Sequence, residues 1–438
     1  MLYNYSGKKI LILGMGLTGI SCINFFLKKG ITPKIIDESA HPIYLKTIPK
    51  KIKYHVGNLK KTWILESDII VISPGISSNK PILKQAKKLG INVISDIELF
   101  SREVTVPIIA ITGTNGKSTV ATIVKKIAKR AGYNVSLCGN IGYPVLDTLE
   151  KKFNLHVIEI SSFQLEHTFC LKPKIAVILN ITHDHINRYP NGFKEYKKIK
   201  LSIYKQAEIC INNNFNILDI PIKTSKQWIS FGSIKSDYYI LHHKNNTFLC
   251  NKGKKIINTN QMLLYGQHNY QNILAVLAIA DSMTFPRSHT MDIIRTFSGL
   301  PHRLQIINTH KGICCINDSK STNVSSVKAA LTCLRSKGTI WLLLGGDKKN
   351  ANFHVLKKYL KNMKVRIYCF GKDGIYLSKI YSKKSIYTPT LKQAVSLISK
   401  KVVSGDTVLL SPGCSSLDQF PNFEERGNQF IQFVRDLI

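Results

Sequence analysis

The sequence predicts an α/β protein of three domains, each built on a sheet of mainly parallel strands. The chain has 438 residues, more than one ordinary core holds, and its length corresponds to about three domains. Short apolar runs alternate with amphipathic helical patterns over most of the chain. Such alternation is typical of parallel, doubly wound sheets.

The first domain is expected over residues 1–95, with a Rossmann-like fold. KKILILGMG predicts a strand and a turn, ISCINFFLKKG an amphipathic helix, and ITPKIID a second strand ending at Asp37. DIIVISPGI predicts a further buried strand that ends in a turn at Gly75. The LGMGLTG turn and Asp37 also fit a dinucleotide fingerprint. That pattern alone is weak evidence for NAD, because no second dehydrogenase feature accompanies it.

The second domain is expected over residues 96–300, with a mostly parallel sheet like that of P-loop ATPases. VPIIAIT predicts a strand, GTNGKST a loop and VATIVKKIAKRAG a helix, while HVIEIS and KIAVILNIT predict two more strands. The Asn- and Lys-rich residues 211–260 carry short alternating runs, which suggest a small antiparallel patch. QNILAVLAIAD predicts an apolar helix.

The last domain is expected over residues 301–438 and is again Rossmann-like. GICCINDS, GTIWLLLGGD, VRIYCFG and DTVLLSPG predict four strands, with helical stretches between them. Both domain boundaries rest on pattern and motif alone.

The composition is that of a globular protein with a strong positive charge. There are 62 basic and 26 acidic residues, a net charge of +36. A nucleic-acid or membrane-surface protein is one interpretation. The favoured interpretation of the charge is compositional drift toward lysine, because the lysines are scattered and form no motif with aromatic residues. We therefore expect no nucleic-acid or membrane partner.

Other features favour a cytoplasmic protein. No apolar stretch of roughly 18 residues is present to span a membrane, and the apolar run near the N-terminus leads into a glycine turn, as a first strand does. The ten cysteines include no C-x-x-C pair and no zinc-like spacing. Reduced cysteines in the cytosol explain them best.

The strongest functional motif lies between a predicted strand and a predicted helix. It consists of Gly113, Thr114, Asn115, Gly116, Lys117, Ser118 and Thr119. Glycines let backbone N–H groups approach phosphate oxygens, and a helix N-terminus adds positive potential. Lys117 is expected to reach the β- and γ-phosphates, and Ser118 to bind magnesium. Ile111 stands where a full Walker A motif has glycine.

Polar residues follow the next two predicted strands. Glu159 ends HVIEI, where it could bind magnesium directly or through water, or simply cap a helix. The following strand runs into NITHDHINR, whose histidines, acid and arginine suggest metal and acyl-phosphate chemistry. Lys200 lies in the lysine-rich helical stretch KEYKKIKLSIYKQ, where residue chemistry alone favours a solvated lysine.

These motifs carry a resemblance that runs nearly end to end. GTNGKST, EISSFQLE, NITHDHINRY, GQHNYQN, GLPHR and NDSKSTN occur in the order found in the Mur ligase family. SPGCSSLDQFPNFEERG and the LGMGLTG turn resemble the D-glutamate-adding member. The resemblance implies a cytoplasmic, ATP- and Mg²⁺-dependent ligase of peptidoglycan precursor synthesis. It would join D-glutamate to UDP-N-acetylmuramoyl-L-alanine through an acyl phosphate, as a monomer with small-molecule substrates only.

The resemblance also assigns roles to residues. The catalytic residues would be Lys117, His185 and Lys200. The magnesium ligands would be Ser118, Glu159, His185 and Lys200, the last after carbamylation. ATP would contact the phosphate loop and Asn269, Asn272, Arg303, Asp318 and Lys320. The uridine diphosphate substrate would contact Leu17, Thr18, Asp37, Gly75 and Asn140. The D-glutamate pocket would contain Thr322, Lys349, Ser416 and the backbone around Phe423.

The chain departs from the family pattern near the predicted metal site and in the predicted glutamate pocket. His183 and Asn187 stand where the family often has acids, so we expect the surroundings of the metal site to be tuned differently from the family's. Lys348 replaces a residue that is commonly small, and of the two neighbouring lysines Lys349 is favoured for glutamate.

Four alternative functions are open. Folylpolyglutamate synthase shares the phosphate loop and glutamate addition but lacks the domain expected at residues 1–95. Sister ligases that add L-alanine, a diamino acid or a dipeptide are closer, although SLDQF and Lys349 favour D-glutamate. A nucleic-acid-binding protein would follow from the charge and would bind DNA with a steep salt dependence. A non-catalytic wall protein is opposed by the intact Lys117, Glu159 and Lys200.

Overall fold

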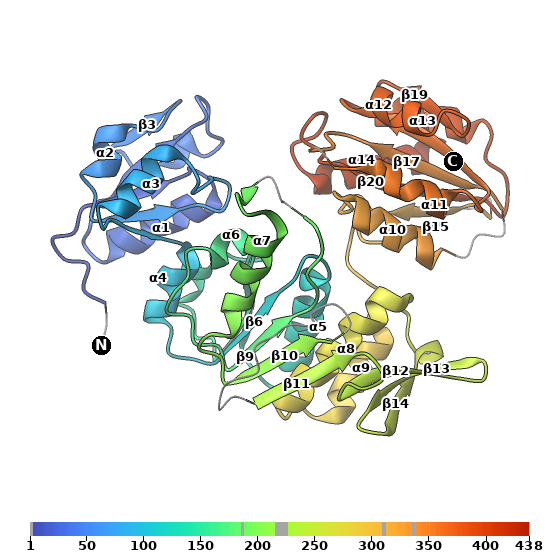
Figure 1. The fold of residues 1–438 in the computed structure, drawn as a ribbon, viewed down its shortest axis with the longest axis horizontal. Coiled ribbons are helices and arrows are strands. Elements are labelled where there is room, and N and C mark those ends of the chain that lie inside the picture. The colour runs from blue at the N-terminus through green and yellow to red at the C-terminus, as the bar shows by residue number, and fades with distance from the viewer. Residues whose placement is uncertain are drawn as a thin grey trace. The chain divides into compact units, whose positions relative to one another are not determined.

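The chain forms three α/β sheets among the residues that the structure describes (Figure 1). This computed structural model describes residues 3–184, 188–214, 227–308, 312–334, 338–349 and 351–437. It divides into two compact units. The first comprises Met1–Met262 and Asn269–Thr296 and holds two of the sheets; the second comprises Leu263–His268 and Phe297–Ile438 and holds the third.

The N-terminal sheet has five parallel strands in the order β3-β2-β1-β4-β5. They are β1 (Ile10–Leu13), β2 (Lys34–Asp37), β3 (Tyr54–Val56), β4 (Ile69–Ile72) and β5 (Asn92–Ile94). Its helices are α1 (Leu17–Lys28), α2 (Lys61–Leu65) and α3 (Pro81–Lys88). Helix α4 (Asp96–Glu103) follows β5 and contacts α6 (Ser162–Leu165), which lies beside the central sheet. Alternate residues of a strand point to opposite faces. Ile10 accordingly belongs to the same core cluster as Phe26 of α1, whereas Leu11 belongs to another cluster with Leu83 of α3. Helices on both faces confirm the predicted Rossmann-like fold.

The central sheet has nine strands in the order β14-β13-β12-β11-β10-β9-β6-β8-β7. Its parallel part contains β6 (Ile108–Thr112), β7 (Val135–Gly139), β8 (Leu155–Glu159), β9 (Ile175–Ile178), β10 (Ile209–Asn213) and β11 (Gln227–Gly232). Its antiparallel end contains β12 (Tyr238–His243), β13 (Asn246–Asn251) and β14 (Lys254–Asn258). The predicted antiparallel patch is therefore present, but it continues the main sheet because β12 pairs in parallel with β11.

Helices accompany the central sheet on its parallel side. They are α5 (Lys117–Arg130), α6 (Ser162–Leu165), α7 (Gly192–Leu201), α8 (Gln267–Ser282) and α9 (Arg287–Thr296). Helix α5 follows β6 directly through the phosphate loop and contacts α9. The apolar helix predicted from QNILAVLAIAD is α8, whose residues from Ile273 to Ala280 are buried. The phosphate loop is thus carried on a strand and a helix that are both held in the core.

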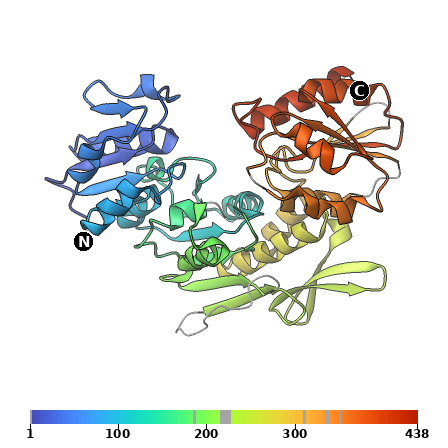
Figure 2. The same ribbon diagram turned by 45° about the horizontal axis from the view of Figure 1, so that its top comes forward.

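The C-terminal sheet has six strands in the order β15-β16-β20-β17-β18-β19. Figure 2 shows this sheet together with its helices. They are β15 (Gln305–Asn308), β16 (Cys314–Asn317), β17 (Ile340–Gly345), β18 (Val365–Phe370), β19 (Ser385–Thr388) and β20 (Thr407–Gly413). The four predicted strands are the inner ones. The two edge strands were not predicted because each has apolar side chains that face solvent, such as Ile306 on β15 and Tyr387 on β19.

Helices cover both faces of this sheet. They are α10 (Val324–Cys333), α11 (Lys357–Leu360), α12 (Gly374–Ile380), α13 (Leu391–Ser399) and α14 (Phe423–Leu437). Val327 of α10 and Leu377 of α12 belong to one core cluster, and Val395 of α13 and Phe430 of α14 belong to the other. A Rossmann-like C-terminal fold is thereby confirmed.

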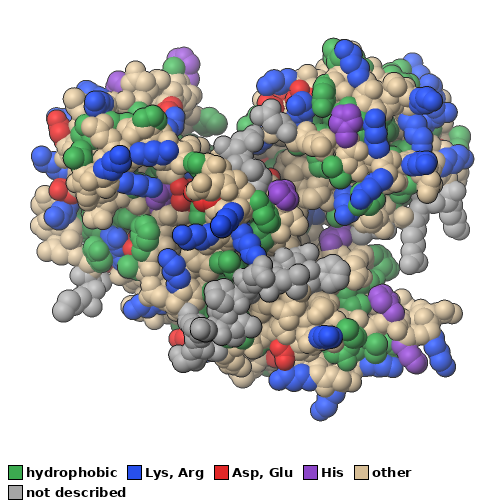
Figure 3. Space-filling view, in the orientation of Figure 1, with side chains coloured by type: hydrophobic (Ala, Val, Ile, Leu, Met, Phe, Trp, Pro, Cys, Tyr) green, Lys and Arg blue, Asp and Glu red, His purple; other side chains and the backbone are tan. Residues whose placement is uncertain are grey.

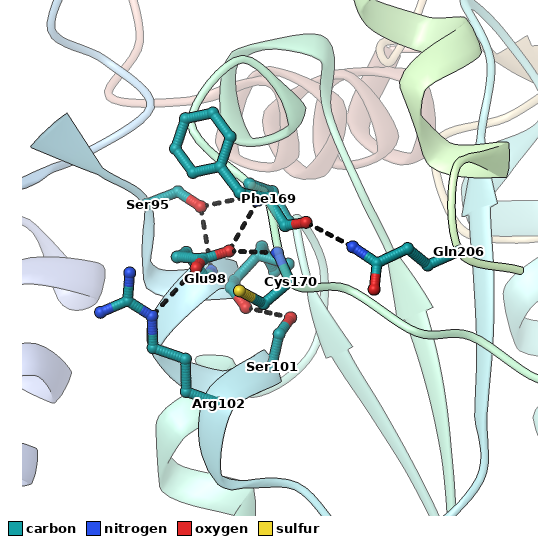
Figure 4. A network of polar contacts seen from close by, with 9 residues as sticks. Ser95, Glu98, Ser101, Arg102, Phe169, Cys170 and Gln206 are labelled. Carbon is teal, nitrogen blue, oxygen red and sulfur yellow. Dashed lines mark hydrogen bonds and ion pairs between the residues drawn. The ribbon is translucent and has the colours of Figure 1, made fainter. Parts of the chain in front are cut away.

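The buried Glu98 carboxylate fixes α4 to the segment that follows α6 (Figure 4). The Glu98 carboxylate accepts hydrogen bonds from the backbone N–H groups of Phe169 (2.6 Å) and Cys170 (2.8 Å). The Arg102 Nε donates to the same carboxylate at 2.9 Å, and the Ser95 hydroxyl caps the helix by accepting from the Glu98 N–H at 3.1 Å. Because both charges are buried and hydrogen-bonded, this contact holds the two segments in one arrangement.

The surface carries the positive charge in a dispersed form. Figure 3 shows Lys and Arg side chains spread over the visible face, with no single basic patch on it. Within the described part of the chain, no helix has the length and apolar character to cross a membrane.

Candidate active site

Three neighbouring strands of the central sheet bring the predicted phosphate and metal residues to one edge. Strand β6 lies between β8 and β9, and Ile111 of β6 pairs with Glu159 while Thr112 pairs with Ile178. The phosphate loop, Glu159 and the segment after β9 therefore follow strand ends that lie side by side. Ligands of open α/β sheets bind at such carboxyl ends.

The phosphate loop is held by two asparagines. The Asn180 side chain accepts the N–H groups of Thr114 (3.1 Å) and Asn115 (2.9 Å) and donates to the Asn115 carbonyl (3.0 Å). Gly116 has a φ of 88°, and a Cβ there would lie 2.3 Å from the Asn272 Oδ1. Only glycine fits this close approach. The structure thus brings Asn272 to the loop, and it adds Asn180, which sequence reasoning did not single out.

Lys117 folds back over its own loop at the start of α5. Its ammonium donates to the carbonyls of Gly113 (2.8 Å) and Thr114 (2.9 Å). Ser118 and Thr119 follow in the first turn of α5 and are buried. The helix N-terminus and the lysine together concentrate positive potential at the loop.

Lys200 is buried, and the interpretation of a solvated lysine is wrong. Only 1% of the residue is exposed, because α7 turns this face toward β6. The Nζ donates to the Gly113 carbonyl at 3.0 Å and to the Thr112 hydroxyl at 3.3 Å. It also lies 4.9 Å from the centre of the Tyr196 ring. The lysine-rich sequence of α7 gave no sign of this, since exposed lysines surround it.

Burial changes the proton affinity of Lys200. Desolvation, and then the nearby Lys117 cation, lower its pKa well below the usual value, while the Asp184 and Glu159 carboxylates oppose them. A buried ammonium with a cationic neighbour is unfavourable, so the neutral amine is favoured.

Glu159 has one oxygen without a partner. Its Oε1 accepts from the Asn140 side chain at 2.7 Å, and its main-chain carbonyl accepts from the Asn140 N–H at 2.8 Å. Among the described residues, its buried Oε2 has no hydrogen-bond partner. A buried, unpaired carboxylate oxygen is costly unless a ligand satisfies it.

The structure describes only some of the predicted magnesium ligands and their neighbours. His185 and Asn187 lie outside the described residues. His183 is described and stacks on Phe193, with ring centres 4.3 Å apart. In the described ranges, no three His, Cys, Asp or Glu side chains gather as a ready metal site.

The residues expected for the uridine substrate fall into two places of the first unit. In the N-terminal sheet, Leu17 and Thr18 follow β1, Asp37 ends β2 and Gly75 follows β4. Asn140 lies beside Glu159 in the central sheet. Both Asp37 oxygens accept backbone N–H groups, Oδ2 from Met15 at 2.6 Å and Oδ1 from Ser39 at 2.8 Å. Asp37 therefore shapes the loop itself.

The other residues predicted to bind ATP belong partly to the first unit and partly to the second. Asn269 is a buried residue of α8 in the first unit, and Arg303, Asp318 and Lys320 belong to the second. Asp318 accepts from the Ser411 hydroxyl (2.8 Å) and the Leu304 N–H (3.2 Å). Burial raises the pKa of Asp318 to about 7, against these hydrogen bonds and the charge of Arg303.

A buried arginine holds the loop after Asp318. Arg426 is fully buried; its Nε donates to the Ser319 hydroxyl (3.0 Å), and its two terminal nitrogens donate to the carbonyls of Cys414 (3.1 Å) and Ser319 (2.8 Å). Lys320 follows, with its ammonium 3.6 Å from the centre of the Phe423 ring. Sequence analysis did not identify Arg426, because an arginine in a charged helical stretch usually faces solvent.

The expected D-glutamate residues follow three adjacent strands, β16, β17 and β20. Ser416 is buried and Phe423 half-buried, whereas Thr322 and Lys349 are exposed. Lys349 has a φ of 46°, and its N–H donates to the Asp347 carboxylate at 3.0 Å. Between the described residues, no hydrogen bond joins the Lys349 ammonium to Thr322 or Ser416. Their grouping as a pocket stays a prediction.

The fold and the loop define a class of protein: a multidomain α/β enzyme that binds a nucleotide at a phosphate loop. Three family models match the chain in order: a MurD-like N-terminal domain of Mur ligases at residues 8–95, the Mur ligase middle domain at 111–280, and the glutamate ligase domain at 302–414. The chain belongs to the Mur ligase family.

Curated relatives align over the whole chain. A UDP-N-acetylmuramoylalanine–D-glutamate ligase of Buchnera aphidicola subsp. Acyrthosiphon pisum is 64% identical over 439 residues and covers 100% of both chains. The Escherichia coli protein of the same name is 47% identical and covers 99% of each. Among solved structures, the UDP-N-acetylmuramate-alanine ligase of Thermotoga maritima has a TM-score of 0.63 at 18% identity, covering 98% of this chain and 99% of that one. This structural likeness supports the fold alone.

Proposed function

We propose that the chain is an ATP-dependent ligase that adds D-glutamate to UDP-N-acetylmuramoyl-L-alanine. The observation that carries this proposal is the 64% identity to a curated ligase of that name over the full length of both chains. We further propose the division into a UDP-sugar-binding domain (1–95), an ATP-binding domain (96–300) and an amino-acid-binding domain (301–438). A role in cytoplasmic peptidoglycan precursor synthesis, and hence in cell shape and division, follows from this reaction.

The residues at the central strand ends fit ATP with Mg²⁺. The Glu159 Oε2 is buried and lacks a partner, so it offers a carboxylate oxygen of the kind that magnesium prefers. Ser118 is the first-turn hydroxyl that a phosphate loop supplies to the metal. When bound, Mg²⁺ would neutralise charge on the phosphates. His185 is proposed as a ligand of a second metal.

Lys200 fits a carbamylated lysine. Its lowered pKa favours the neutral amine, which is the form that attacks CO₂. The nitrogen forms a bond to the carbon, one proton is released, and a carbamate anion results. This change would replace a buried neutral amine with an anion beside the Lys117 cation, and it would supply carboxylate-like oxygens to a metal ion.

The chemistry assigned to the chain is positioning and charge neutralisation. The substrate carboxylate attacks the γ-phosphate, ADP leaves, and an acyl phosphate forms. The D-glutamate amine then attacks the acyl carbon, and phosphate leaves. Lys117 would hold the phosphates and neutralise their charge during transfer. Asn269, Asn272, Arg303, Asp318 and Lys320 are proposed to bind the rest of ATP.

The two other substrates need different partners. We assign the uridine diphosphate group to Leu17, Thr18, Asp37, Gly75 and Asn140. D-Glutamate carries two carboxylates, which require a cation and hydrogen-bond donors once they leave water. Lys349, Ser416, Thr322 and the Phe423 backbone are proposed to supply them. The protein would act as a monomer on small molecules, with no nucleic-acid or membrane partner.

Phosphate release from MgATP with UDP-N-acetylmuramoyl-L-alanine tests this function. D-Glutamate, L-glutamate, L-alanine and a diamino acid are compared as amines. Release only with D-glutamate, with a product of matching mass, is expected. Release with another amine would assign a sister activity, and no release with any of them would contradict ligase function.

A further inference from the structure

Arg188 holds the turn that follows β4. Its two terminal nitrogens donate to the carbonyls of Pro74 (2.7 Å) and Ile76 (2.8 Å). The guanidinium lies 3.9 Å from the centre of the Phe163 ring, which supports it from another side. The Arg188 carbonyl in turn accepts from the Asn79 side chain. A planar guanidinium with two fixed donors sets the directions of both carbonyls.

These two contacts also fix the directions of two N–H groups. A trans peptide is planar, so its C=O and its N–H point in opposite directions. With the Pro74 carbonyl held toward Arg188, the Gly75 N–H points away from it. The same holds for the Ile76 carbonyl and the Ser77 N–H. Among the described residues, neither N–H donates a hydrogen bond to another backbone group.

The space at the turn is open to a ligand. A Cβ added at Gly75 would meet no atom within 4 Å, whereas one at Gly14, across the sheet edge, would lie 2.7 Å from Ser73. The turn and the Gly14 loop follow β4 and β1, which are adjacent strands of the N-terminal sheet. From β1 the sheet continues to β2 and β3 on one side and to β4 and β5 on the other, so the strand order reverses between β1 and β4. Open α/β sheets bind their ligands at the carboxyl ends of the strands at such a point.

We propose that Arg188 is a positioning residue that aims the Gly75 and Ser77 N–H groups at the diphosphate of the uridine substrate. The inference rests on the proposed function for the identity of that substrate. Hydrogen bonding polarises each peptide, and the guanidinium adds positive charge behind both donors. Arg188 lies on the segment that follows β9, next to the phosphate loop strand β6. Arg188 thus connects the turn that contains Gly75 to the edge of the central sheet where phosphoryl transfer is proposed to take place.

The test compares Arg188→Lys and Arg188→Met with the wild type in the full-length protein. Lysine keeps the positive charge but cannot donate to both carbonyls with the fixed bidentate geometry of a guanidinium. Calorimetry measures binding of UDP and of ATP, and kinetics give KM for each substrate. We expect both variants to bind UDP at least about tenfold more weakly and to show a matching rise in KM for UDP-N-acetylmuramoyl-L-alanine. ATP affinity and KM for ATP should stay unchanged.

The matched control is Arg130→Lys, since Arg130 forms an exposed ion pair with Asp292. It should leave both affinities unchanged. Wild-type UDP affinity in Arg188→Lys and Arg188→Met would overturn the inference. So would an equal loss of UDP and ATP binding with a lowered unfolding temperature, which would indicate a purely structural role. If the wild type binds UDP but shows no D-glutamate-dependent turnover, the proposed function fails while the UDP comparison still decides the role of Arg188.

Discussion

The phosphate loop and the loop carrying Lys349 hold their lysines in different ways. In the central sheet, the ammonium groups of Lys117 and Lys200 both donate to the Gly113 carbonyl, and Lys200 is buried. In the C-terminal unit, Lys349 is exposed, and its backbone N–H donates to the Asp347 carboxylate. Under the proposed function, phosphate chemistry would rely on side chains that are preorganised, whereas amino-acid recognition would rely on a side chain that the ligand must order.

The largest effect is expected from Lys117→Ala. Removing the cation at the phosphates should lower turnover by about a thousandfold or more, in the range found for preorganised electrostatic groups. The fold should be retained because the ammonium donates to carbonyls of its own loop and contributes little to core packing. Phosphate release and thermal unfolding measure the two quantities. Lys129→Ala, an exposed position on the same helix, is the control. Turnover close to that of the wild type would remove Lys117 from the site.

Lys200→Ala tests the preorganised region in a second way. Activity should fall by about a hundredfold or more, as for other groups that support a metal site. A short carboxylic acid should restore part of it by standing in for the carbamate. Added bicarbonate should raise the activity of the wild type after CO₂ depletion and leave the variant unchanged. Full activity without any rescue would end the carbamate hypothesis.

Lys349→Ala tests the exposed region. Loss of a charge-assisted hydrogen bond should raise KM for D-glutamate by about 10- to 100-fold, with KM for ATP unchanged. Lys348→Ala serves as the comparison, because the Lys348 ammonium lies 4.8 Å from the centre of the Tyr376 ring. If Lys348→Ala shows the larger change, the neighbouring lysine contacts glutamate instead.

Two buried groups, one in the central sheet and one at the end of a strand of the C-terminal sheet, should respond oppositely to pH. Burial lowers the pKa of His156, beside β6, to about 4, so its stabilising contribution exists above pH 6.5 and is lost as the pH falls toward 4. Burial raises the pKa of Asp318 to about 7, so its contribution exists below pH 3.8 and is lost as the pH rises toward 7. Each group can change the free energy of unfolding by at most about 1.4 kcal/mol per pH unit.

Denaturant unfolding from pH 4 to 8 measures these slopes. His156→Gln should remove the loss of stability on the acid side, and Asp318→Asn should remove the loss between pH 4 and 7. If either variant keeps the slope of the wild type, the corresponding group is not its source.

The inner strands could be predicted from sequence, because burial on both faces gives continuous apolar runs such as IIAIT of β6 and WLLLG of β17. Edge strands β15 and β19 could not, since apolar and polar residues both face solvent there. The phosphate loop was recognisable because its glycines and lysine are close in sequence. Those features depend on local chain geometry alone.

Contacts made by distant segments were beyond sequence reasoning. Asn180 supports the phosphate loop from a different strand, and Arg188 reaches the turn at Gly75 from more than a hundred residues away. The burial of Lys200 and of Arg426 depends on which helix face meets the sheet. A charged residue on an amphipathic helix gives no local sign of that outcome. The family resemblance, not the local pattern, identified Lys200.

The most direct test of the proposed reaction follows oxygen from the substrate carboxylate. UDP-N-acetylmuramoyl-L-alanine labelled with ¹⁸O in its alanyl carboxylate is incubated with the protein, MgATP and D-glutamate, and the released phosphate is analysed by mass spectrometry. Formation of an acyl phosphate predicts one ¹⁸O in each phosphate, together with a D-glutamyl product. Unlabelled phosphate, formed at the same rate without D-glutamate, would show simple ATP hydrolysis and contradict the account.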